Sequence, residues 1–187
     1  MGLQGPEAAS ERWAPGEASE EGTCDMSGAP QDDGHRAVIL DGLEAAGLEA
    51  LPVGDDRWMT LLEGEHKRTI PVLLELGERS LTVSSLLAGV PDEGHADVYR
   101  ILLQRNQRPL PVHFALDDEG DLILVGRVPR AALDARSFDE LLGLLLTQSD
   151  ETFDQVLRAG FGTYIDVEQR WRAKVGLPPN PVGDPHA

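Results

Sequence analysis

Five short runs of strand-patterned residues constrain the fold of this chain more than any other feature. Apolar residues occupy every other position from Ile70 to Leu76, so one face of that run is apolar. The connections at 64–67 and 77–79 have hairpin length, which predicts antiparallel neighbours. Pro71 cannot donate a backbone hydrogen bond, so its run is predicted to lie at an edge or to carry a bulge. The five runs cover residues 57–63, 68–76, 80–87, 112–116 and 122–127.

Helical patterning precedes these runs and separates the third from the fourth. Ile39, Leu43 and Ala46 share one face of a first predicted helix, which Gly47 closes. A second helix is predicted over 91–107, because it opens with proline and two acidic residues and then carries an apolar stripe.

Two further helices are predicted after the last strand-patterned run. Ser137 and Glu140 have the spacing of a capping box, which starts the third helix. We expect that helix to break or bend near Ser149-Asp150 and to stop at Gly160. The fourth helix carries one apolar stripe, made of Tyr164, Val167, Trp171 and Val175.

These elements predict the α+β class, with an antiparallel five-stranded sheet, packed helices and the order α-β-β-β-α-β-β-α-α. The single domain is expected at residues 34–178. Residues 1–33 contain 8 acids and 1 arginine, a charge of 1 − 8 = −7, and few apolar residues, so a disordered tail is expected. Residues 179–187 are rich in proline and glycine and are predicted to form a flexible tail.

The charge of the chain limits its partners. With 16 Lys and Arg against 33 Asp and Glu, the formal net charge is −17. A surface this acidic repels phosphate backbones and anionic lipid headgroups. We therefore expect neither nucleic acid nor a membrane as partner. No apolar run approaches the roughly 20 residues that cross a bilayer, and the first residues lack a secretion-signal pattern. The sequence therefore predicts a cytoplasmic protein.

The reactive residues do not form a catalytic pattern. His95 shares a helical face with Asp92 alone among its acidic neighbours, and no histidine pairs with a second ligand at metal-binding spacing. Cys24 is the only cysteine. The acids within 117–121 fit a hairpin turn containing Gly120 better than a calcium loop. We expect a protein that is not an enzyme and that uses no cofactor and no metal.

Two groups of residues are candidates for partner binding. Three arginines cluster toward the end of the second helix, where they either complement the helix dipole or, together with Arg127 and Arg130, bind an anion or an acidic partner. Leucines of the third helix exceed what one buried stripe needs, so they either mark a docking surface, with homodimerisation as a first use, or are covered within the domain. The candidates are Arg100, Arg105, Arg108, Arg127, Leu142 and Leu146.

Three segments together resemble the actinobacterial branch of the YbjN family: VYRILLQRNQRPLPVHFALDDEGDLILVGRVP, SFDELLGLLL and DETFDQVLRAGF. The resemblance covers most of residues 36–175. It implies a fold similar to type III secretion chaperones, with the order α-β-β-β-α-β-β-α, and a role in sensory transduction regulation through binding. It supplies no catalytic residues, and the acidic extension and the Trp171 helix are additions to it.

Together, patterning and resemblance predict a non-enzymatic protein-binding module, chaperone-like or regulatory, whose partner is another protein or a peptide segment. The alternative is a sensor domain that binds a small ligand in an arginine-lined pocket, with Arg100, Arg105 or Arg127 orienting it.

Overall fold

A computed structural model describes residues 29–179 of the chain. The predicted tails at 1–33 and 179–187 therefore lie almost wholly outside the described residues. The first helix begins at Ala29, before the domain start that was predicted at residue 34.

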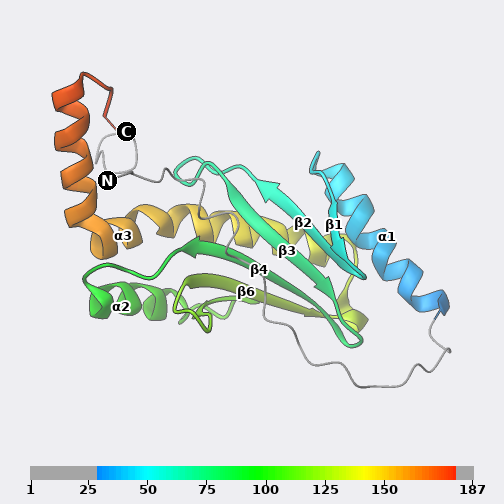
Figure 1. Ribbon diagram of the computed structural model, residues 1–187. Coiled ribbons are helices and arrows are strands. Elements are labelled where there is room, and N and C mark those ends of the chain that lie inside the picture. Colours follow the sequence, from blue (N-terminus) through cyan, green and yellow to red (C-terminus); the bar gives the residue numbers. More distant parts are fainter. Residues whose placement is uncertain (1–28, 180–187) are drawn as a thin grey trace.

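The sheet is antiparallel and has six strands in the order β1-β2-β3-β4-β6-β5 (Figure 1). The α+β class is confirmed, with one strand more than predicted. The additional strand, β1, is short and fully exposed and contains a proline and a glycine, so it lacks the buried alternation by which strands are recognised. The elements are α1 Ala29–Ala45, β1 Leu51–Gly54, β2 Arg57–Leu62, β3 Ile70–Leu76, β4 Ser80–Ala88, α2 His95–Arg105, β5 Val112–Leu116, β6 Leu122–Pro129, a 3-10 turn at Arg130–Ala132 and α3 Ala135–Val175.

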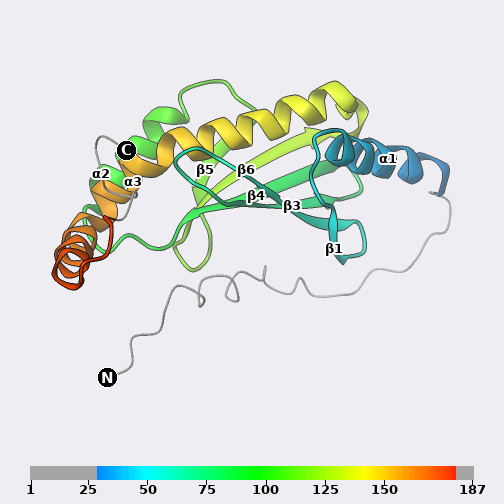
Figure 2. The same ribbon diagram turned by 90° about the horizontal axis from the view of Figure 1, so that it is seen from above.

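The three α-helices lie on the same side of the sheet, and α3 runs along it (Figure 2). Side chains from that side of the strands pack with the inner faces of the helices into one core, in which Ile39, Leu43 and Phe138 are fully buried. The prediction for Ala46 is wrong: it follows the end of α1 and is exposed, because Gly47 already turns the chain at φ 70°.

The predicted apolar face of β3 is confirmed, since Ile70, Val72 and Leu74 are all fully buried. The prediction from Pro71 is wrong in both forms, because β3 lies between β2 and β4 and neither of its ladders has a register shift. Pairing with β4 begins only at Val72, so the ladder with β4 does not include the proline.

The second helix begins later than predicted. Asp92 and Glu93 precede α2, and their backbone N–H groups donate to the carbonyl of Gly160, at 2.9 and 3.1 Å. The helix starts after Gly94, which has φ 59°. Tertiary contact with α3 therefore takes the two acids out of the helix that their sequence favours.

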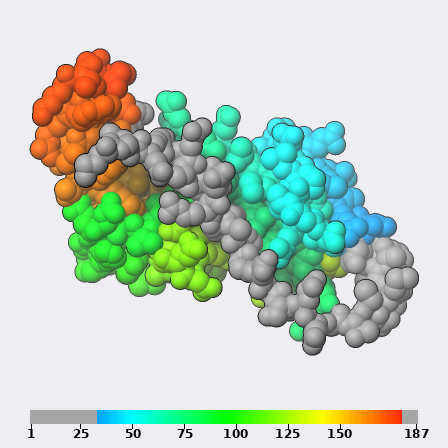
Figure 3. Space-filling model, in the orientation of Figure 1, coloured from blue at the N-terminus to red at the C-terminus, as the bar shows by residue number. Residues whose placement is uncertain are grey.

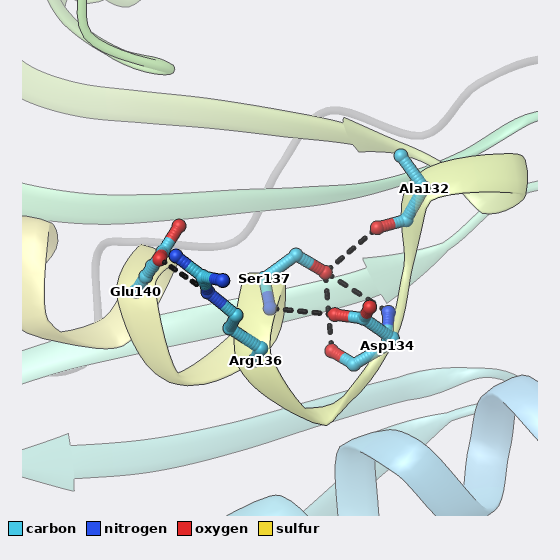
Figure 4. Close-up of polar contacts among 5 residues, drawn as sticks. All are labelled: Ala132, Asp134, Arg136, Ser137 and Glu140. Carbon is cyan, nitrogen blue, oxygen red and sulfur yellow. Dashed lines mark hydrogen bonds and ion pairs between the residues drawn. The ribbon is translucent and has the colours of Figure 1, made fainter.

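The N-terminus of α3 is capped one turn earlier than the predicted pair (Figure 4). Asp134 is the N-cap: its carboxylate accepts the N–H of Ser137 at 2.7 Å, and the Ser137 hydroxyl accepts the N–H of Asp134 at 2.9 Å. Glu140 instead pairs with Arg136 at 3.0 Å. Ser137 therefore occupies position N3 of the capping box and is not the N-cap.

The predicted break at Ser149-Asp150 is wrong, because α3 continues through it. Ser149 is fully buried, and the Asp150 carboxylate accepts the backbone N–H groups of His66 and Lys67 at 2.8 Å each. The local sequence at Ser149-Asp150 favours a turn, but these contacts keep it helical. The helix kinks instead at Phe161 (φ −140°, ψ 16°), beside the predicted stop at Gly160.

The hairpin predicted at 117–121 is confirmed. Gly120 has φ 88°, and one carboxylate oxygen of Asp117 accepts the backbone N–H groups of Glu119 and Asp121, at 3.0 and 2.9 Å. Within residues 29–179, no group of three His, Cys, Asp or Glu side chains is placed to hold a metal ion. None of the helices in the same range combines the length and the apolar composition that a bilayer crossing requires.

Candidate binding surface

None of the helices in residues 29–179 lies on the second face of the sheet, which we call the open face (Figures 1 and 2). Cross-strand register defines two apolar rows on it. One row runs through Leu51, Met59, Leu73, Ser84 and Val125. The other contains Leu61 beside Pro71, and Leu86 beside Ile123 and Ala115.

These rows are mainly apolar, but Ser84 interrupts the first row on β4, and the exposed His113 ends it on β5. Leu61 and Leu51 are 48% and 40% exposed. Leu73, which lies between β2 and β4 on this face, is only 4% exposed. Met59 and Ile123 are half-buried. Exposed aliphatic side chains grouped on one sheet face are typical of an interaction site.

A charged row borders the apolar rows at one end of the open face. Arg57 is paired with Glu75 at 2.9 Å, and Thr82 and Arg127 continue the row across β4 and β6. A cavity of about 460 Å³ opens here. Its charged lining residues are four acids and three arginines: Asp55, Asp56, Glu75, Glu78, Arg57, Arg79 and Arg127. This balance lacks the positive excess that an anionic ligand would need.

The two edges of the sheet differ. At β5, the side-chain amide of Asn106 donates to the Phe114 carbonyl at 3.0 Å and accepts the Phe114 N–H at 2.8 Å. Asn106 thus satisfies the outward backbone groups of Phe114, the middle residue of this edge strand, with which a further strand would otherwise pair. The opposite edge is β1, which is exposed and carries Pro52.

The predicted arginines do not form one site. Arg100 is paired with Asp97 one turn earlier on α2. Arg105 donates to the Glu151 carbonyl of α3 at 3.0 Å, and Arg108 is exposed just beyond α2. All three come from the helical side, whereas Arg127 lies on the open face, so no single pocket contains them.

The leucine surplus of the third helix is accounted for within the domain. Leu142 is 6% exposed and belongs to the core, and Leu146 is half-buried against it. A partner therefore cannot reach Leu142. The apolar surface available for docking lies on the open face instead. The alternation within each strand did not show which of its two sets of residues faces the core and which faces outward.

Lys67 is a buried residue that sequence patterning missed. Its Nζ donates to the carbonyls of Leu86 and, at 2.9 Å, Leu87, and lies 5.6 Å from the centre of the Phe153 ring. Burial lowers the pKa of this amine to about 8. These two carbonyls lie where the register between β4 and β6 shifts, between Leu86 and Ala88, and Lys67 satisfies both of them.

The profile of the YbjN family, described as "Putative bacterial sensory transduction regulator", matches residues 35–158. The chain belongs to the YbjN family. The family resemblance expected from the three sequence segments is thereby confirmed, and the match covers every strand, α2 and α3 as far as residue 158.

Two mycobacterial proteins are relatives of this YbjN-family chain. One, an uncharacterized protein of Mycobacterium tuberculosis, is 41% identical over 115 residues, which is 62% of this chain and 63% of that protein. The chain therefore spans less than two thirds of that relative. The other, an uncharacterized protein of Mycobacterium leprae, is 36% identical over 145 residues, 75% of this chain and 79% of that protein.

The fold of this YbjN-family chain is similar to that of a chain in the HopA1-SchA chaperone–effector complex. The TM-score is 0.51 and the identity 14%, over 64% of this chain and 93% of that chain. The predicted similarity to type III secretion chaperones is confirmed at the level of the fold.

The YbjN match ends just before the kink in α3, and the residues just before α2 hold that kink in place. The Glu93 carboxylate accepts the backbone N–H of Thr163 at 2.6 Å and its hydroxyl at 2.8 Å, which lowers the pKa of Glu93. A Cβ on Gly94 would lie 2.1 Å from the Ala159 carbonyl oxygen, so only glycine fits there. The helix after the kink thus has a defined attachment.

Proposed function

We propose that this YbjN-family chain is a non-enzymatic protein-binding module, chaperone-like or regulatory, that holds a segment of another protein on its open face. The observation that carries the proposal is the pair of apolar rows, which cross the strands and remain partly exposed at Leu51 and Leu61. The fold shared with a chain of a chaperone–effector complex supports it.

The charge of the chain indicates what kind of segment fits. Residues 34–187 contain 15 basic and 25 acidic side chains, a charge of 15 − 25 = −10, and the whole chain carries −17. Two copies meeting face to face would bring these charges together, which opposes association. We therefore propose a partner segment that is neutral or basic and that presents aliphatic side chains to the rows.

A photoreactive residue placed on the open face tests this proposal in the native cell. We expect cross-links to one protein when the residue replaces Leu61 or Ile123, and not when it replaces Leu103, an exposed leucine on α2. The cross-linked peptide should be neutral or basic and rich in aliphatic residues. Equal capture at Leu103, capture only of the chain itself, or capture of an acidic polar peptide would contradict the proposal.

A further inference from the structure

The last part of α3 carries an apolar stripe that no other part of residues 29–179 covers. Beyond the kink at Phe161, the helix stands out at one end of the molecule (orange to red in Figure 3). Tyr164, Val167, Trp171 and Val175 are 63%, 52%, 51% and 52% exposed. Their spacing of three, four and four residues keeps them on one face over three turns.

The stripe is not the side by which this helix attaches to the body. Ile165 is the buried residue of the segment, and Glu168 and Arg172, paired at 2.9 Å, are half-buried. The contact of Glu93 with Thr163 fixes the beginning of the segment. The attachment side is thus occupied and the apolar stripe is left over, in a place where a partner can approach it.

Charge along the segment is divided between its two halves. The acid Asp166 comes first and the bases Arg170 and Lys174 follow, while Glu168 and Arg172 are already paired with each other. Two identical helices side by side in parallel would set acid against acid and base against base. In an antiparallel pair the acidic half of each helix meets the basic half of the other, and the apolar stripes remain in contact.

We propose that residues 162–175 bind the same segment of a second copy, antiparallel, in a two-fold symmetric dimer. In this arrangement the two bodies lie at opposite ends of the helix pair, so their net negative charges are kept well apart compared with a Debye length of about 10 Å. The segment lies beyond the YbjN match, which ends at residue 158, and leaves both open faces free for partners. The proposal therefore does not depend on the proposed function.

Light scattering after size exclusion, on the full chain over a range of concentrations, tests the dimer. We expect a dimer whose dissociation constant rises roughly tenfold or more in Trp171→Asp, because central tryptophans dominate such interfaces. The control Leu103→Asp replaces a more exposed apolar residue, on α2, and should leave the dimer unchanged. Circular dichroism checks that each variant is folded. A monomer at every concentration, or a dimer weakened by Leu61→Asp and not by Trp171→Asp, would overturn the proposal.

Disulfide formation tests the orientation, in a Cys24→Ser background that removes the only natural cysteine. In an antiparallel pair, Tyr164 of one copy lies near Val175 of the other. A mixture of Tyr164→Cys and Val175→Cys chains should form mixed disulfides, and neither variant alone should cross-link. Efficient cross-linking within either single variant, or no mixed product from a dimeric sample, would contradict the antiparallel arrangement.

Discussion

Asn106 takes the place of a neighbouring strand for Phe114. One side-chain amide makes both hydrogen bonds that the free edge of β5 offers at this residue, at 2.8 and 3.0 Å. The same residue ends α2, where its backbone N–H donates to the Leu102 carbonyl. A single asparagine therefore connects the end of a helix to the edge of the sheet, and occupies the backbone groups of Phe114 that another chain would pair with.

Replacing Asn106 with alanine should lower the free energy of unfolding by about 2 kcal/mol, because two hydrogen bonds are lost and the Phe114 backbone groups lose their partners. Urea denaturation measures this change. Gln107→Ala, on the neighbouring exposed residue, is the control and should change stability little. Equal midpoints for the two variants would show that the edge closure contributes nothing.

Gly126 should not tolerate even a methyl group. A Cβ there would lie 2.9 Å from side-chain carbons of Val112 and Val83 and 3.0 Å from Leu141, where β6 passes under α3. We expect Gly126→Ala to destabilise the protein by about 1–3 kcal/mol through overpacking. Gly143→Ala, in α3 with nothing within 4 Å, should stabilise it by roughly 0.5–1 kcal/mol. Thermal unfolding compares the two, and the same sign for both would contradict this account.

Lys67 should make stability rise with pH in the alkaline range. Its pKa is about 8 in the folded protein against an ordinary 10.5, so between these values the unfolded chain binds more protons. Burial of the protonated Lys67 amine lowers the free energy of unfolding, and this loss is fully present below pH 8. About 3 kcal/mol of the free energy of unfolding is regained as the pH approaches 10.5. Urea denaturation across this range should show the slope in the native protein and in Lys174→Met, but not in Lys67→Met. A slope that persists in Lys67→Met would contradict the assignment.

Glu93 should stabilise the backbone of α3 at its kink against local opening. Its pKa lies below the ordinary 4.5 because Thr163 donates two hydrogen bonds to the ionised carboxylate. The stabilisation is therefore present above pH 4.5 and is lost as the pH falls through the lowered value. Glu93→Gln should speed amide hydrogen exchange around Thr163 at neutral pH, while Asp92→Asn should not. The difference from the native protein should vanish in acid; exchange identical in both variants would show that Glu93 does not hold the kink.

Periodicity in the sequence was enough to predict the α+β class and the five buried strands, because these strands alternate over several residues. It failed at β1, which buries nothing, and at Ser149-Asp150, where contacts with His66 and Lys67 override a local turn preference. It also placed Asp92 and Glu93 in a helix, although both bind the kink of α3. The last two failures arise from contacts between residues distant in the chain, which local patterns do not report.

The candidate binding residues were predicted less well than the fold. The leucine-rich helix attracted the prediction of a docking surface, but Leu142 lies in the core. The open face was hidden because its residues, such as Leu61 and Ile123, alternate in strands whose sheet order was unknown. Which face the helices cover is decided by tertiary packing. The exposed stripe of Tyr164, Val167, Trp171 and Val175 was readable as a stripe, but not as one left uncovered.

The central claim is that the open face holds a partner segment. The most direct test measures how tightly the peptide identified by cross-linking binds two matched variants. Isothermal titration calorimetry should give at least about a tenfold weaker dissociation constant for Leu61→Asp, because one charge is then buried against aliphatic side chains without a partner. Leu103→Asp, on α2, should bind as tightly as the native protein. Unchanged affinity for Leu61→Asp, or an equal loss in both variants, would contradict binding on the open face.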